Sequence, residues 1–161
     1  MSSFSVTTAA FLEHWQGHRR LTRRVIEAFP EQELFSYSVG GMRPFAQLAF
    51  EMVGMARGGI RGVATREWVY TAELMHHAGS SPTTKAALLA LWDTTTSEID
   101  GYWPQIPGSR FEEVDTAFGQ WEGVVNGLMQ YWIDNEIHHR GQGYVYLRAL
   151  GIEPPAFYDR S

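Results

Sequence analysis

The chain has 161 residues, 44% of them apolar, which is enough for one core, so we expect a single domain over residues 1–161. The absence of cysteine excludes disulfide bonds, thiolate zinc sites and a cysteine nucleophile, and a formal net charge of −5 argues against a nucleic-acid partner. The longest apolar run, residues 86–92, is far shorter than the roughly 20 residues of a membrane span, and no signal peptide is visible, so we expect a cytoplasmic protein with no membrane partner.

The first predicted helix covers residues 7–29. Apolar and weakly polar side chains recur there at spacings of three and four and define one face: Phe11, Trp15, His18, Thr22, Val25 and Phe29. Four arginines lie on the opposite side, and we interpret them as a solvated face rather than an anion site: Arg19, Arg20, Arg23 and Arg24. Pro30 ends the helix, and residues 31–42 are expected to form a loop with a tight turn at Gly40-Gly41.

The second predicted helix begins at Pro44, where proline is tolerated in the first turn. Its apolar face is formed by Phe45, Leu48, Ala49, Met52, Val53 and Ala56. Glycines at positions 58, 59 and 62 are expected to weaken its end.

Residues 65–80 show no clean periodicity. The third helix is expected to follow a cap at Ser81-Pro82 and to run toward Pro104, and residues 104–119 are predicted to form an irregular linker with one or two short strands.

The last predicted helix covers residues 120–150 and ends at Gly151. Residues spaced alternately four and three apart share one face of this helix: Leu128, Trp132, Asn135, His139, Gln142, Tyr146 and Ala149. Because large apolar residues begin this face, it should point into a bundle and bury the three polar groups in its middle. Burying such a group without a partner costs about 1–3 kcal/mol, so side chains, water or a metal ion must satisfy it.

Histidines are the other candidate ligands. Asn135 and His139 are four residues apart, so both side chains can reach one ion, although a buried polar network is the more common outcome of this spacing. We interpret His14 and His18 as hydrogen-bonded histidines of the core, and His76-His77 as exposed residues.

The end of the chain carries a recognisable motif. Residues 135–142 read Asn-Glu-Ile-His-His-Arg-Gly-Gln, followed by Tyr146-Leu147-Arg148, Gly151, Pro154-Pro155 and Tyr158. This resembles the C-terminal signature of the DinB/YfiT-like superfamily, approximately His-x-x-His-His-Arg-Gly-Gln followed by Tyr-Leu-Arg, Gly, Pro and Tyr. Residues 42–48, Met-Arg-Pro-Phe-Ala-Gln-Leu, resemble the family's entry to its second helix, so the resemblance covers nearly the whole chain.

The resemblance implies an all-α, up-down-down-up four-helix bundle, commonly a homodimer and associated with stress responses. It also implies a divalent metal held by three histidines, one on the second helix and two, spaced i and i+4, on the fourth. Relatives include thiol S-transferases and isomerases that use low-molecular-weight thiols, whose pKa the metal lowers. The resemblance implies structural roles for Arg140 and Arg148 and places Gln142 in the cleft.

This chain departs from the family pattern at two of the three metal positions. Glu51 stands where the second-helix histidine is expected and Asn135 where the first histidine of the pair is expected; His139 keeps its family identity. The candidate metal ligands are therefore Glu51, Asn135 and His139, a set that suits zinc, nickel, manganese or iron with water at the open positions. Alternatively, Glu51 bonds His139 directly and holds it as imidazolium without a metal.

Two functions follow from these alternatives. One is a divalent-metal-dependent enzyme, a thiol-dependent S-transferase or a hydrolase that acts on a small electrophilic molecule. Because the chain has no cysteine, the thiol would come from a cofactor. The other is a non-catalytic, stress-related bundle whose polar cluster is a structural or ligand-binding network.

Overall fold

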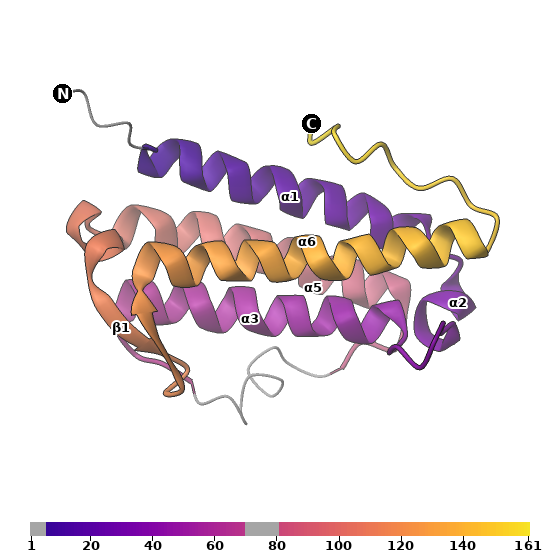
Figure 1. Ribbon diagram of the computed structural model, residues 1–161, viewed down its shortest axis with the longest axis horizontal. Coiled ribbons are helices and arrows are strands. Elements are labelled where there is room, and N and C mark those ends of the chain that lie inside the picture. Colours follow the sequence, from indigo (N-terminus) through magenta and orange to yellow (C-terminus); the bar gives the residue numbers. More distant parts are fainter. Residues whose placement is uncertain (1–5, 70–80) are drawn as a thin grey trace.

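The computed structural model describes residues 6–69 and 81–161. Its long helices are α1 (Thr8–Ala28), α3 (Phe45–Thr65), α5 (Lys85–Tyr102) and α6 (Val125–Ala149). Figure 1 shows α1 and α6 running in one direction and α3 and α5 in the other. The expected all-α, up-down-down-up bundle is confirmed. None of the helices in the two described ranges combines the length and hydropathy that a membrane crossing requires.

Short elements complete the two ends of the bundle. Helix α2 (Glu31–Ser36) lies at one end, where the sequence predicted a loop. At the other end, the 3-10 turns η2 (Trp103–Gln105) and η3 (Gly108–Glu112) lead into the strands β1 (Val114–Ala117) and β2 (Trp121–Val124), which pair antiparallel with Ala117 opposite Trp121. The predicted linker with short strands is therefore confirmed, but its second strand consists of residues for which the sequence predicts the start of the last helix.

Several helix ends differ from the sequence prediction, each for a local reason. Helix α5 is capped by Thr84, whose hydroxyl accepts from the amide of Ala87 at 3.2 Å, and not by Ser81-Pro82. Helix α6 begins at Val125 rather than at residue 120, because the preceding four residues form β2. The predicted stop at Gly151 is confirmed, since this residue has a φ of +75° and such a conformation suits glycine at a helix end.

The glycines of α3 correct another expectation. They do not weaken the helix, which continues to Thr65. A Cβ atom added to Gly59 would lie 2.6 Å from the Trp132 ring, and one added to Gly62 would meet the Trp68 ring. The same holds for Gly143 on α6, where a Cβ would lie 2.5 Å from the Phe45 ring. Glycine here lets α3 and α6 approach closely.

The apolar core consists of two clusters. One includes Trp15, Ile60 and Trp132 and extends to the hairpin, while the other includes Phe45 and Tyr146 and extends to α2. Between them, on α1, α5 and α6, buried polar residues form what we term the polar layer: His18, Arg19, Thr22, Thr95, Glu136, His139 and Arg140.

Arg19 and Glu136 form the centre of the polar layer. The Arg19 guanidinium lies 3.4 Å from Glu136 and 3.9 Å from the ring centroid of Trp92. The hydroxyl of Thr22 donates to the other Glu136 oxygen at 2.7 Å. Arg19 is fully buried, so the interpretation of all four arginines as a solvated face is wrong for this residue. Burial raises the pKa of Glu136, although the charge of Arg19 opposes that shift.

Arg140 and His18 lie beside this pair. Arg140 donates to the Thr22 hydroxyl at 3.1 Å and to Nδ1 of His18 at 3.0 Å. Burial is the main cause that lowers the pKa of His18 to about 3, and the charge of Arg140 adds to it. His18 is thus a neutral, hydrogen-bonded core histidine, as the sequence predicted, whereas its neighbour His14 is exposed.

The C-terminal segment returns along the bundle after α6, and Figure 1 shows it extending back over α1. Arg20 donates to the carbonyl of Arg160 at 2.8 Å, and Arg24 contacts the carboxylate of Asp159 at 3.1 Å. These arginines hold the C-terminal segment against α1. Their contacts therefore connect the two ends of the described chain.

Candidate functional site

The candidate site lies where α3 and α6 cross. Glu51 is in the second turn of α3, next to the buried Met52, and its side chain is 29% exposed. His139 is in the middle of α6 and is 8% exposed. The glycine contacts on either side of this point, at Gly59 and Gly143, bring the two helices close enough for these side chains to meet.

Glu51 and His139 contact each other directly. Oε1 of Glu51 lies 3.2 Å from Nε2 of His139, and the other oxygen of Glu51 lies 2.5 Å from the guanidinium of Arg43. Nδ1 of His139 lies 2.7 Å from Oε1 of Gln142, whose amide nitrogen donates to the sulfur of Met42 at 3.1 Å. Because each ring nitrogen faces an acceptor oxygen, this geometry suits the imidazolium form of His139.

The pKa values of the pair shift in the directions that mutual stabilisation produces. The hydrogen bond from His139 is the main cause that lowers the pKa of Glu51 to about 2, and Arg43 adds to it while burial opposes it. Burial alone would lower the pKa of His139, but the hydrogen bonds to Glu51 and Gln142 outweigh it, so this pKa is raised. At neutral pH, Glu51 is therefore ionised.

These shifts predict how stability depends on pH. The contribution of Glu51 is complete above its ordinary value of 4.5 and is lost as the pH falls through about 2. The contribution of His139 is complete below its ordinary value of 6.5 and is lost as the pH rises through its raised pKa. Urea unfolding should therefore show that Glu51→Gln costs about 1 kcal/mol more at pH 5.5 than at pH 9. An equal cost at both pH values would contradict the ion pair, and Glu13→Gln serves as the exposed control.

Asn135 is the third ligand that the sequence named. It is partly exposed as a residue and lies one turn before His139 on α6. Its side-chain oxygen is buried and has no hydrogen-bond partner. A buried oxygen without a hydrogen-bond partner lowers the stability of the fold, unless a water molecule or a bound ion contacts it.

The structure thus brings Glu51 and His139 together and leaves Asn135, one turn before His139 on α6, with a side-chain oxygen that has no hydrogen-bond partner. In residues 6–69 and 81–161, no group of three histidine, cysteine, aspartate or glutamate side chains could hold a metal ion. His76-His77 lie outside the described residues.

Sequence reasoning missed two parts of this region. The sequence predicts no role for Arg43 at the site, since a residue ahead of the helix has no fixed spacing to Glu51. Glu136 lies on a second stripe of α6 with the buried residues Met129, Ile133, Arg140 and Leu147. A glutamate and an arginine among the apolar residues of this stripe are the signal in the sequence that could have revealed the polar layer. The expected position of Gln142 in the cleft agrees with its contact to His139.

Comparisons with known proteins agree with this architecture. A family model described as the DinB family matches residues 1–161. The fold is similar to that of a DinB-like protein from Bacillus subtilis, with a TM-score of 0.71, 19% identity, and coverage of 92% of this chain and 96% of that one. It is also similar to a DinB-like protein from Bacillus cereus, with a TM-score of 0.73, 16% identity, and coverage of 93% and 97%. No curated protein gives a match.

Proposed function

We propose that this chain, which belongs to the DinB family, is a cytoplasmic enzyme that uses a divalent metal ion held by Glu51, Asn135 and His139 to act on a small electrophilic molecule. The observation that carries the proposal is the buried oxygen of Asn135, which has no partner although it lies one turn from the Glu51–His139 pair. A carboxylate, an amide oxygen and an imidazole together are a donor set that zinc, nickel, manganese and iron accept.

The roles of the chain's own residues follow from their contacts. Glu51 supplies negative charge, because its carboxylate is ionised at neutral pH. Gln142 orients the ring of His139 through Nδ1, as residues behind a metal ligand commonly do. Arg43 holds the second oxygen of Glu51. When bound, the metal would lower the pKa of a coordinated water or of a low-molecular-weight thiol cofactor.

The test is metal binding to untagged, EDTA-treated protein, because an affinity tag would introduce nickel. Calorimetric titration with Mn²⁺ or Zn²⁺ at pH 7.5 should show one site, which Glu51→Gln and His139→Ala weaken by about tenfold or more. Asn135→His should strengthen zinc binding by a similar factor, since imidazole is the better zinc ligand. Affinity should fall as the pH is lowered, because the metal competes with the proton on His139. Equal and negligible binding in all variants would refute the proposal.

The alternative function is a non-catalytic bundle in which the same residues form a structural or ligand-binding network. The observation in its favour is the continuous chain of contacts from Arg43 through Glu51 and His139 to Gln142. It predicts that His139→Ala lowers the melting temperature by several degrees while added Zn²⁺ or Mn²⁺ leaves the wild-type value unchanged. A metal-dependent rise in the wild-type melting temperature excludes it.

The proposal includes a homodimer. Its support is the outer face of α6, where the large apolar side chains of Tyr131 and Val145 are 59% and 54% exposed. Light scattering across a range of concentrations should give twice the monomer mass. Tyr131→Glu, which puts a charge on this face, should give the monomer mass, and a strict monomer of the wild type at high concentration would contradict the dimer.

A further inference from the structure

A partly open cavity of about 370 Å³ lies beside the candidate site, a size typical of small-molecule pockets. Helix α2, the start of α3 and the residues ahead of α5 surround it. Its walls are mainly apolar and come from Phe35, Ala46, Phe50 and Pro82, while Arg43 and Gln47 supply polar groups. Phe50 is only 5% exposed, so the aromatic wall is fixed by the packing of the core.

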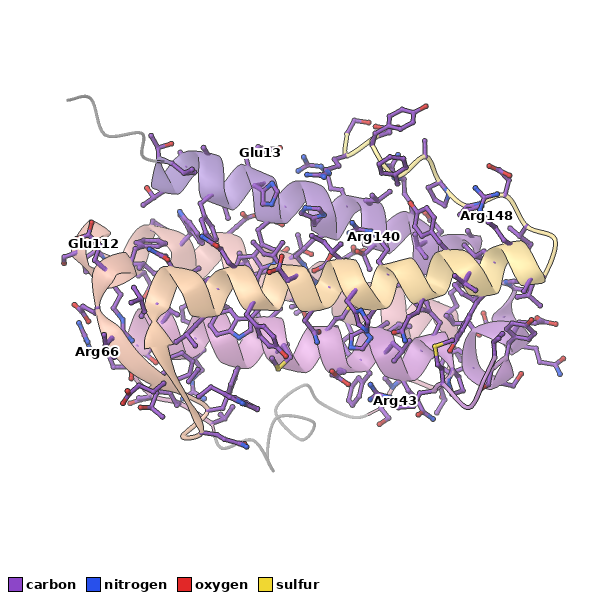
Figure 2. All side chains as sticks on the ribbon, in the orientation of Figure 1. Glu13, Arg43, Arg66, Glu112, Arg140 and Arg148 are labelled. Atoms are coloured by element: carbon purple, nitrogen blue, oxygen red, sulfur yellow. The ribbon has the colours of Figure 1, made fainter. Side chains whose placement is uncertain are left out.

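Arg43 joins this cavity to the candidate site. It lines the cavity and contacts Glu51 at 2.5 Å. Its side chain is nevertheless 48% exposed. Figure 2 shows Arg43 near the start of α3 and Arg140 on the other side of α6, toward α1. A molecule in the cavity would therefore lie near the Glu51 carboxylate and on the opposite side of α6 from Arg140.

Arg43 is the charged residue among those that line the cavity, and it is positive. A guanidinium has five N–H donors in a flat fork that matches a carboxylate, and Nη2 of Arg43 is the nitrogen that lies 2.5 Å from Oε2 of Glu51. Because the side chain is 48% exposed, further N–H groups of Arg43 can donate to a second carboxylate. From this cation and the apolar walls we infer that the cavity binds a small carboxylic acid with an aromatic or short aliphatic body, its carboxylate on Arg43 and its body between Phe35 and Phe50.

This inference names the substrate class of the proposed enzyme and, for the reaction itself, rests on the proposed function. A ligand carboxylate on Arg43 would share the guanidinium charge that now neutralises Glu51. The carboxylate of Glu51 then interacts more strongly with a cation held by His139. The acid and the metal ion should therefore each raise the affinity of the other, as coupled sites must.

The experiment compares phenylacetate with phenylacetamide, which has the same shape and no charge. Calorimetry on metal-free protein should show phenylacetate binding at least tenfold more tightly than phenylacetamide. Arg43→Gln should abolish this preference, and Arg43→Lys should keep part of it, since lysine retains the charge without the fork. Arg61→Gln, which removes an arginine of α3 whose side chain is 39% exposed and does not line the cavity, is the control and should leave the preference unchanged.

Equal affinities for phenylacetate and phenylacetamide, or a preference that survives Arg43→Gln, would overturn the inference. Because Arg43 is half exposed, the glutamine variant should fold, and its circular dichroism spectrum checks this. Titration of Mn²⁺ without phenylacetate tests the proposed function alone. Phenylacetate binding that depends on Arg43, in a protein that binds no Mn²⁺, would remove the proposed function and leave the cavity assignment standing.

Discussion

Replacing Glu136 by leucine is expected to lower the free energy of unfolding by about 3–5 kcal/mol, because the variant leaves the guanidinium of Arg19 buried without its carboxylate. The Arg19→Met variant should cost a similar amount, since Glu136 then loses the cation 3.4 Å away. The double variant Arg19→Met/Glu136→Leu should recover part of this loss, because it removes both charges of the pair, although the buried Arg140 then loses the nearby charge of Glu136. Urea unfolding at pH 7 measures all three in one double-mutant cycle.

The control for this cycle is the exposed pair of Arg20 and Glu13, whose side chains are 41% and 71% exposed. Glu13→Gln should change the unfolding free energy by less than about 1 kcal/mol, since water already screens that pair. Two results would contradict our account of the polar layer. One is a cost below about 1 kcal/mol for Glu136→Leu, and the other is a double variant as unstable as the sum of the single ones.

Gly143→Ala is the second substitution with a large expected effect. Its Cβ would lie 2.5 Å from the Phe45 ring, which is itself fully buried, so α3 and α6 must separate. Such overpacking costs about 1–3 kcal/mol, which urea unfolding would measure. Because these helices carry Glu51 and His139, the variant should also weaken Mn²⁺ binding.

Gly141 offers a matched control two residues earlier on the same helix. A Cβ there would meet nothing within 4 Å, so Gly141→Ala should raise stability by about 0.4–1 kcal/mol through a less flexible unfolded chain. Equal effects of the two alanine variants would show that the close approach at Gly143 does not set the helix spacing.

The helices and the site are predicted from different features of the sequence. Apolar periodicity predicted the long helices, because each buries one face. The meeting of Glu51 with His139 came only from the family resemblance, since nothing local connects residues 88 positions apart. The structure supports that pairing through its 3.2 Å contact.

The sequence predictions that are wrong have physical reasons. The sequence predicts a solvent-exposed Arg19, because burying a charged side chain is unfavourable without a partner. That partner, Glu136, lies 117 residues further along the chain. The sequence predicts that Gly59 weakens the end of its helix, because helix propensity describes an isolated helix, whereas here the Trp132 ring occupies the space that a side chain would fill. The sequence predicts helix for residues 121–124, and that prediction is wrong because these residues pair with β1 as a strand.

The bond between Thr22 and Glu136 also bears on how the protein is made in the cell. These residues are 114 positions apart, so at the usual speed of translation, about 5–20 residues per second, the ribosome needs roughly 6–23 s to go from one to the other. During that interval the nascent first helix displays Arg19 and its apolar neighbours without α6 to cover them. Exposed apolar surface of this kind is what chaperones recognise, so early protection of the emerging chain should favour a high yield of folded protein.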